Sequence, residues 1–171
     1  IISNEGPGNI AMHFGIHGPA FIITTACASG TDAIGNALYA IRDGRADVVI
    51  SGGTEGCITE LGIGGFCALK ALSTGYNETP EKASRPFDKD RDGFVIAEGA
   101  GMLVLEELEH ARKRGAPILA ELAGYGSTSD AYHLTAPDPE GRGAADAMRI
   151  ALDDAGMHPE DIDYINAHGT S

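Results

Sequence analysis

The sequence predicts an α/β fold, because strand and helix patterns alternate in it twice. In the first alternation, a β-branched run at 21–25 precedes a helical pattern at 33–41, and an apolar run at 47–53, closed by glycines, follows. Gly44 stands where a helix C-cap glycine is expected. Strand, helix and strand at this spacing indicate a βαβ unit with a parallel sheet.

The second alternation occupies the end of the chain. An apolar run at 118–125 predicts a strand, an amphipathic pattern at 143–155 predicts a helix, and a run at 162–166 predicts another strand. The order is again that of a βαβ unit, so both ends of the sequence favour the same fold class.

One further strand and helix connect the two alternations. The apolar run at 102–105 predicts a strand, and the charged segment at 106–114 predicts a helix with basic residues at its end and Gly115 as its stop. We place a domain boundary after this glycine, which divides the chain into residues 1–115 and 116–171.

Composition excludes several functions. The formal net charge of −13 argues against nucleic acid and anionic membranes as partners. No apolar run approaches the roughly 20 residues of a membrane helix. Three cysteines without a CxxC pair argue against a disulfide framework and a zinc site, and indicate a reducing, cytoplasmic location. The sequence does not begin with Met, and both of its ends look cut.

Cys27 is the candidate nucleophile. It lies between the predicted strand and a helix of small residues, so its sulfur is expected near a helix N-terminus, where a thiolate is favoured. The Cys27 N–H is an expected oxyanion donor. An inert core cysteine is the alternative, and these features alone leave the two interpretations equal. Cys67 is expected in the core, and Cys57 receives no role.

His168 is the candidate partner of this cysteine. It follows the last predicted strand, and the carboxyl ends of parallel strands are where α/β sites are built. An ordinary loop histidine is the alternative. His133, in a polar loop, is a weaker candidate. His13 and His17 are four residues apart, but no carboxylate accompanies them, so a metal site is not expected there.

The acidic run at 88–93 resembles the start of a calcium-binding loop. Acids stand at positions 1, 3 and 5 and a glycine at position 6, but position 12, which should be Glu, is Gly99. We favour a tight turn in which Arg85 and Arg91 pair with the acids. The glycines elsewhere do not complete a dinucleotide-binding pattern.

Three motifs resemble those of the β-ketoacyl synthases. They are Thr-Ala-Cys-Ala-Ser-Gly at 25–30, Ser-Arg-Pro-Phe-Asp-Lys-Asp-Arg-Asp-Gly-Phe-Val at 84–95 with Glu-Gly-Ala-Gly at 98–101, and Asn-Ala-His-Gly-Thr-Ser at 166–171. The motifs occur in the order and spacing of that family, and the resemblance covers nearly the whole chain. The Ala-Ser-Gly context is most similar to the elongating synthases (type II) of dissociated fatty acid synthesis.

The resemblance implies a thiolase-like fold, in which two α/β halves form αβαβα layers, here incomplete. Residues 1–115 would be the later part of the N-terminal half, and residues 116–171 the beginning of the C-terminal half. It also implies a homodimer with the strand before Cys27 near the two-fold axis. We expect no cofactor and no metal.

The resemblance further implies a decarboxylative condensation. Cys27 would take an acyl chain from acyl carrier protein, malonyl carrier protein would lose carbon dioxide, and the enolate would attack the thioester. His168 would stabilise the enolate oxygen. The remaining matches are the pantetheine contacts Thr170 and Thr135, the acyl-pocket residues Phe66 and Gly62, the gating-loop residues Asp130 and His133, and the carrier-protein contact Lys70, with Arg42 and Arg45 as further contributors.

Other family elements lie beyond Ser171. These are the second active-site histidine, a lysine and a glycine-rich Phe loop, so the 171-residue chain is not expected to be active alone. Two alternatives stay open: a ketosynthase acting on polyketide chains, and a non-condensing chain-length partner subunit. The presence of Cys27 argues against the second.

Overall fold

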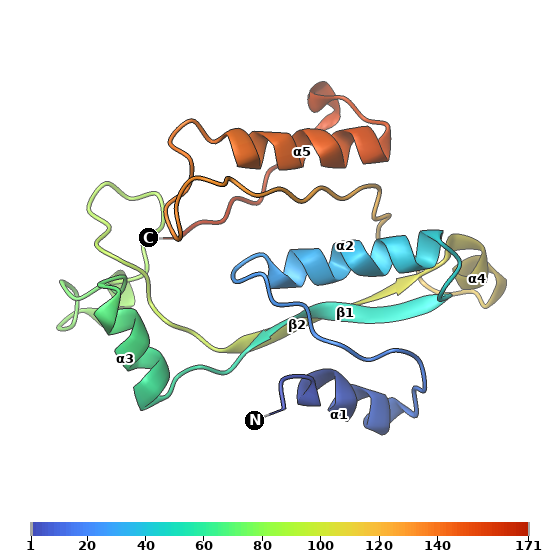
Figure 1. The fold of residues 1–171 in the computed structure, drawn as a ribbon, viewed down its shortest axis with the longest axis horizontal. Coiled ribbons are helices and arrows are strands. Elements are labelled where there is room, and N and C mark those ends of the chain that lie inside the picture. The colour runs from blue at the N-terminus through green and yellow to red at the C-terminus, as the bar shows by residue number, and fades with distance from the viewer. Residues whose placement is uncertain (1, 171) are drawn as a thin grey trace. The chain divides into compact units, whose positions relative to one another are not determined.

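The computed structural model describes residues 2–170 of the chain (Figure 1). Its elements in order are α1 (Glu5–Phe14), α2 (Ser29–Arg42), β1 (Val48–Glu55), α3 (Glu60–Ala68), the 3₁₀ turn η1 (Pro80–Lys82), β2 (Gly99–Glu106), α4 (Leu108–Lys113), α5 (Arg142–Ala155) and the 3₁₀ turn η2 (Pro159–Asp161).

The chain divides into two compact units. The first comprises Ile1–Gly53 with Met102–Asp161, and the second comprises Thr54–Gly101 with Ile162–Ser171. Strands β1 and β2 each continue from one unit into the other.

Strands β1 and β2 form a two-stranded sheet. The Glu107 N–H donates to the Asp47 carbonyl at 2.9 Å, which joins the end of β2 to the beginning of β1 and makes the pair antiparallel. Both strands were predicted, from the runs at 47–53 and 102–105. The predicted parallel pairing between the run at 47–53 and the run at 21–25 is wrong. The neighbour of β1 in the sheet is β2, about fifty residues later in the chain, and an apolar run carries no information on strand direction.

Three predicted strands do not form ladders among residues 2–170. The runs at 21–25, 118–125 and 162–166 are irregular backbone outside any sheet. Outside β1 and β2, the isolated bridges in the described part of the chain join Thr25 to Cys27 and Leu72 to Phe94. A β-branched pattern predicts extended backbone, but a strand also needs a hydrogen-bonding neighbour, and the pattern does not supply one.

The helices follow their sequence signals more closely. Helix α2 begins four residues before the pattern at 33–41, and Gly44 follows its end at φ +67° with its N–H donating to the Ile41 carbonyl. The predicted glycine stop after α4 is also confirmed, since Gly115 lies at φ +68° and donates to the Arg112 carbonyl. Helix α5 begins one residue before the predicted pattern.

The first unit is layered around α2 (Figure 1). In that view α5, the extended segment at 118–127, α2, the β1–β2 pair and α1 follow one another. Helix α2 packs on β1 at ordinary contact distance, since a Cβ added at Gly53 of β1 would lie 3.5 Å from the Gly30 Cα of α2. Cβ atoms at Gly124 or Gly126 would collide with the backbone of α5. Helix α2 therefore lies between the sheet and the extended segment.

Two observations describe the surface. No helix among residues 2–170 is both long enough and apolar enough to span a bilayer. In the same residues, few apolar side chains are buried and most of those are alanine, while many large apolar side chains are exposed, such as Leu119 at 96%. The buried apolar residues are Ala37, Leu38, Ala83 and Ala111.

Candidate functional site

Cys27 is exposed on a tight turn that leads directly into α2. The turn is closed by the Ala28 N–H donating to the Thr25 carbonyl and by the Ser29 N–H donating to the Ala26 carbonyl, both at 3.1 Å. Ala26 lies at φ +52°, a left-handed conformation that costs a non-glycine residue roughly 1 kcal/mol or more. A strained turn that presents a nucleophile just before a helix is the arrangement of a nucleophile elbow.

The Ser29 side chain holds this turn closed. Its hydroxyl donates to the Ala26 carbonyl at 2.7 Å and accepts the Thr25 N–H at 2.8 Å. Sequence reasoning counted Ser29 only as a small neighbour of the cysteine. The signal that was missed is a serine at the first position of a helix, where hydroxyls bond local backbone groups.

Asp32, in the first turn of α2, was also missed. It is 8% exposed, and it accepts hydrogen bonds from the hydroxyls of Tyr125 and, at 3.3 Å, Ser127. Hydrogen bonds from Thr25, Tyr125 and Ser127 hold the pKa of this carboxyl below its usual range, although burial acts in the opposite direction. No local pattern reveals a partner about a hundred residues away.

The predicted gating-loop residues lie in one loop of the first unit. His133 Nδ1 accepts the N–H groups of Thr135 at 3.2 Å and Ala136 at 3.0 Å, which requires a neutral imidazole with its proton on Nε2. Asp130 Oδ2 accepts the Asp138 N–H at 2.9 Å. Both side chains therefore shape the loop that carries Thr135.

Gly62, Phe66 and Lys70 lie on α3 or just after it, in the second unit. Helix α3 is capped by Thr59, whose Oγ1 accepts the Gly62 N–H at 3.1 Å. The Phe66 ring packs edge-to-face against Phe94, with 5.3 Å between centroids. Lys70 is exposed at φ +54°.

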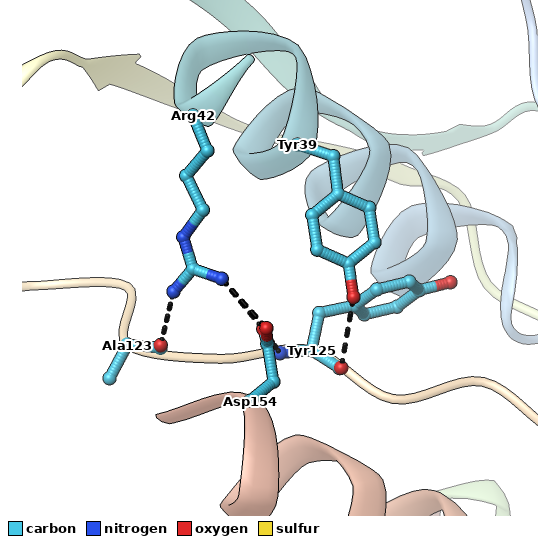
Figure 2. A network of polar contacts seen from close by, with 5 residues as sticks. All are labelled: Tyr39, Arg42, Ala123, Tyr125 and Asp154. Carbon is cyan, nitrogen blue, oxygen red and sulfur yellow. Dashed lines mark hydrogen bonds and ion pairs between the residues drawn. The ribbon is translucent and has the colours of Figure 1, made fainter. Parts of the chain in front are cut away.

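The three cations proposed to meet carrier protein differ in their pairing. Arg42 donates to Asp154 at 2.8 Å, and Arg45 pairs with Asp43 at 2.9 Å (Figure 2 shows the first pair). Within residues 2–170, Lys70 makes no ion pair. Arg42 and Arg45 are thus each paired with a carboxylate of the same unit, and their contribution to a carrier-protein contact stays a prediction.

His168 and Thr170 are exposed in the second unit, beside Gly169 at φ +63°. Cys27, Asp130, His133 and Thr135 belong to the first unit. Ser171, the last residue of the third motif, lies outside the described residues.

The acidic run at 88–93 is used within its own turn. Arg85 donates to the Asp88 carboxylate at 3.1 Å, as predicted, whereas Arg91 donates to the Asp88 backbone carbonyl at 2.8 Å. Asp92 accepts the N–H groups of Thr74 and Gly75. No group of three potential metal ligands occurs in the described part of the chain.

The other two cysteines differ from Cys27. Cys67 is exposed, so its predicted core position is wrong; it lies on the open side of α3. Cys57 is half-buried, and burial together with the nearby Glu55 carboxylate raises the pKa of its thiol. A raised thiol pKa disfavours the reactive thiolate at Cys57.

Family models identify the chain. The model of the β-ketoacyl synthase N-terminal domain matches residues 1–111, and that of the β-ketoacyl synthase C-terminal domain matches residues 119–171. The chain belongs to the β-ketoacyl synthase family. The family that the three motifs indicated is therefore confirmed.

Curated β-ketoacyl synthases match along the whole chain. It is 55% identical over 168 residues to 3-oxoacyl-[acyl-carrier-protein] synthase 2 of Rhizobium meliloti, covering 98% of the chain and 40% of that protein. It is 53% identical over 171 residues to the Staphylococcus aureus protein of the same name, covering 100% and 42%. The mitochondrial 3-oxoacyl-[acyl-carrier-protein] synthase of Arabidopsis thaliana is 52% identical, with 100% and 37% covered. The chain spans about 40% of the length of these relatives.

Solved β-ketoacyl synthase structures share the fold. A ketosynthase complex described as a type II polyketide acyl-carrier protein with its ketosynthase bound to the hexaketide gives a TM-score of 0.94 at 45% identity, covering 98% of this chain and 41% of that one. A β-ketoacyl synthase from Burkholderia phymatum gives 0.88 at 42%, covering 95% and 39%. The predicted fold class, an incomplete α/β thiolase-like fold, is confirmed.

Proposed function

We propose that this chain is part of a 3-oxoacyl-[acyl-carrier-protein] synthase, an acyltransferase that elongates acyl chains by decarboxylative condensation. The observation that carries the proposal is the exposure of Cys27 on a strained turn just before α2. The Ser29 hydroxyl holds this turn closed. The 52–55% identity to relatives with that name supports fatty acid elongation.

The chemistry follows from these groups. The Cys27 thiolate attacks the thioester of acyl carrier protein, forms a new thioester and releases the carrier thiol. Malonyl carrier protein then loses carbon dioxide, and the enolate left behind attacks the Cys27 thioester. The product is a 3-oxoacyl carrier protein two carbons longer, and the thiol is regenerated. His168 donates a hydrogen bond to the enolate oxygen, and the Cys27 N–H donates to the oxyanion formed at the thioester carbon.

The share of its relatives that the chain covers supports a larger active protein. The chain spans about 40% of the length of the curated synthases it matches. We therefore propose a longer intact synthase, and an inactive 171-residue chain. The boundary after residue 115 is part of this proposal, and the gap at 112–118 between the two family matches supports it.

Partners and location complete the proposal. Acyl carrier protein is the proposed substrate carrier, and a ketosynthase of high structural similarity is described in complex with one. Lys70 is the proposed contact for its acidic surface, because this lysine is exposed and makes no ion pair among residues 2–170. We also propose a homodimer, although another similar ketosynthase is described in complex with its chain length factor. The cytoplasmic location stays a prediction.

A condensation assay tests the function. The intact synthase, acyl carrier protein loaded with a saturated acyl chain and malonyl carrier protein should give a 3-oxoacyl product two carbons longer. Cys27→Ala should abolish condensation, and Cys67→Ala, which changes another exposed thiol, should leave it unchanged. Undiminished condensation by Cys27→Ala would reject the proposal. Repeated extension without reduction would instead favour a polyketide ketosynthase, the candidate raised by the hexaketide-bound neighbour.

A further inference from the structure

Asp32 accepts two side-chain hydrogen bonds from a distant part of the chain. Its Oδ1 accepts the hydroxyls of Tyr125 and Ser127, which stand 93 and 95 residues later. Only 8% of Asp32 is exposed. A carboxylate this buried is costly unless its oxygens are bonded, and here the bonds come from the segment that follows the proposed domain boundary.

The extended segment is built to reach this carboxylate. Alternate residues of extended backbone point to opposite sides. Gly124 and Gly126 face α5, where a Cβ would collide with helix backbone, so Tyr125 and Ser127 face α2. The Tyr125 ring lies against Gly35 of α2, where a Cβ would also collide with it.

Tyr125 is fixed from both helices, as Figure 2 shows. Its N–H donates to Asp154 of α5 at 2.9 Å, and its carbonyl accepts the Tyr39 hydroxyl of α2 at 3.4 Å. Arg42 of α2 bonds the same Asp154 carboxylate and the Ala123 carbonyl. The hydroxyl that reaches Asp32 is therefore held at a defined place.

The other side of the network reaches the nucleophile turn. The Asp32 N–H donates to the Ala28 carbonyl at 2.8 Å, so Asp32 is joined through the first turn of α2 to the residue that follows Cys27. Thr25 and Ala28 flank Cys27, and a backbone hydrogen bond of 3.1 Å joins them. Asp32 therefore contacts the turn on one side and the segment at 123–127 on the other.

We propose that Asp32 is a positioning residue for Cys27. Its carboxylate anchors the first turn of α2, and with it the nucleophile turn, to the segment at 123–127. This inference rests on the proposed role of Cys27 as the nucleophile. Among residues 2–170, the titratable group that contacts Asp32 is Tyr125; Tyr39, Arg42 and Asp154 surround Tyr125 rather than Asp32.

Alkylation of Cys27 in the intact synthase tests this role without requiring catalysis. The rate of iodoacetamide addition to the Cys27 peptide is followed by mass spectrometry from pH 6 to 10. Asp32→Asn keeps an oxygen acceptor for the hydroxyls of Tyr125 and Ser127. The rate at the high-pH plateau should stay within about twofold of the wild-type rate, because the turn stays bonded.

Asp32→Ala should behave differently. It leaves the hydroxyls of Tyr125 and Ser127 without an acceptor, so the plateau rate should change by about fivefold or more as the turn loosens. Tyr125→Phe should change the plateau in the same direction by a smaller factor, and it keeps the proposal testable if Asp32→Ala does not fold. Asp43→Asn, the same substitution at the opposite end of α2, should leave the plateau rate unchanged.

Two results would overturn the inference. One is an Asp32→Asn plateau rate changed as much as that of Asp32→Ala, and the other is plateau rates that Asp32→Ala and Tyr125→Phe both leave unchanged. The alkylation readout is independent of turnover. Failure of the proposed function would appear as absent condensation by the wild-type synthase, with the alkylation differences still present.

Discussion

Replacing Gly35 of α2 by alanine should destabilise the protein, which is the opposite of what helix propensity alone predicts. Replacing a glycine inside a helix by alanine ordinarily stabilises the helix by about 1 kcal/mol. At Gly35, however, the new Cβ would collide with the ring of Tyr125. The ring has little freedom to move, because its hydroxyl is bonded to Asp32 and the residue's N–H is bonded to Asp154.

The expected magnitude follows from these opposing terms. Overpacking costs about 1–3 kcal/mol, and the restrained ring places this site at the upper end of that range. Subtracting the propensity gain leaves Gly35→Ala about 2 kcal/mol less stable than wild type. Because the m-value grows with protein size, roughly 4 kcal/mol/M in urea is expected for the intact synthase, and the unfolding midpoint should fall by about 0.5 M.

Urea unfolding of the intact synthase, followed by far-UV circular dichroism, measures this shift. Gly64→Ala in α3 is the matched control, because a Cβ there meets nothing within 4 Å, and it should raise the midpoint. In a Tyr125→Ala background the ring is gone, so Gly35→Ala should become neutral or stabilising. A midpoint raised by Gly35→Ala as much as by Gly64→Ala would refute the predicted contact.

Three further predictions concern the turn, the interhelical pair and acid stability. Ser29→Ala removes both hydroxyl bonds that close the Cys27 turn. Peptide mapping should therefore show the alkylation rate of Cys27 changed by about tenfold, relative to a Ser129→Ala control. An unchanged rate would count against the bonds. Arg42→Met should lower the free energy of unfolding by about 1 kcal/mol, because it breaks the pair with Asp154, in which the arginine side chain is 39% exposed, and the bond to the Ala123 carbonyl; a loss below about 0.5 kcal/mol in urea titration would contradict this. Arg114 lowers the pKa of Glu106 from 4.5 to about 2, so the stability that Glu106 contributes is complete above about pH 4.5 and is lost as the pH falls to about 2. Glu106→Gln should therefore make the free energy of unfolding less dependent on pH in this range. An acid-unfolding curve unchanged by the substitution would argue against the pair.

Local signals allowed much of the fold to be predicted. Gly44 and Gly115 were identified as helix stops, and both take the left-handed conformation that glycine accepts without steric cost. The runs that became β1 and β2 were identified because strand propensity and glycine closure are local properties. Cys27 was identified for the same reason, since its small neighbours and the helix after it are adjacent in sequence.

Non-local contacts were not predicted. The antiparallel partner of β1 and the bond between Tyr125 and Asp32 join residues roughly fifty to a hundred positions apart, and neither periodicity nor spacing specifies such pairs. Cys67 shows the reverse error: its apolar neighbours suggested burial, but α3 leaves this face open within residues 2–170. The pair between Arg42 and Asp154 was also not predicted, because the sequence gives no sign that these two residues lie together.

The central claim is that Cys27 carries the acyl chain, and the mass of the acylated enzyme tests it most directly. The intact synthase is incubated with acyl carrier protein bearing a saturated acyl chain, without malonyl carrier protein, then digested and sequenced by mass spectrometry. The account predicts one acyl group per protomer on the peptide containing Cys27, and none on that peptide in Cys27→Ala. An acyl group found instead on Cys57 or Cys67, or condensation that proceeds with no acyl group on Cys27, would contradict it.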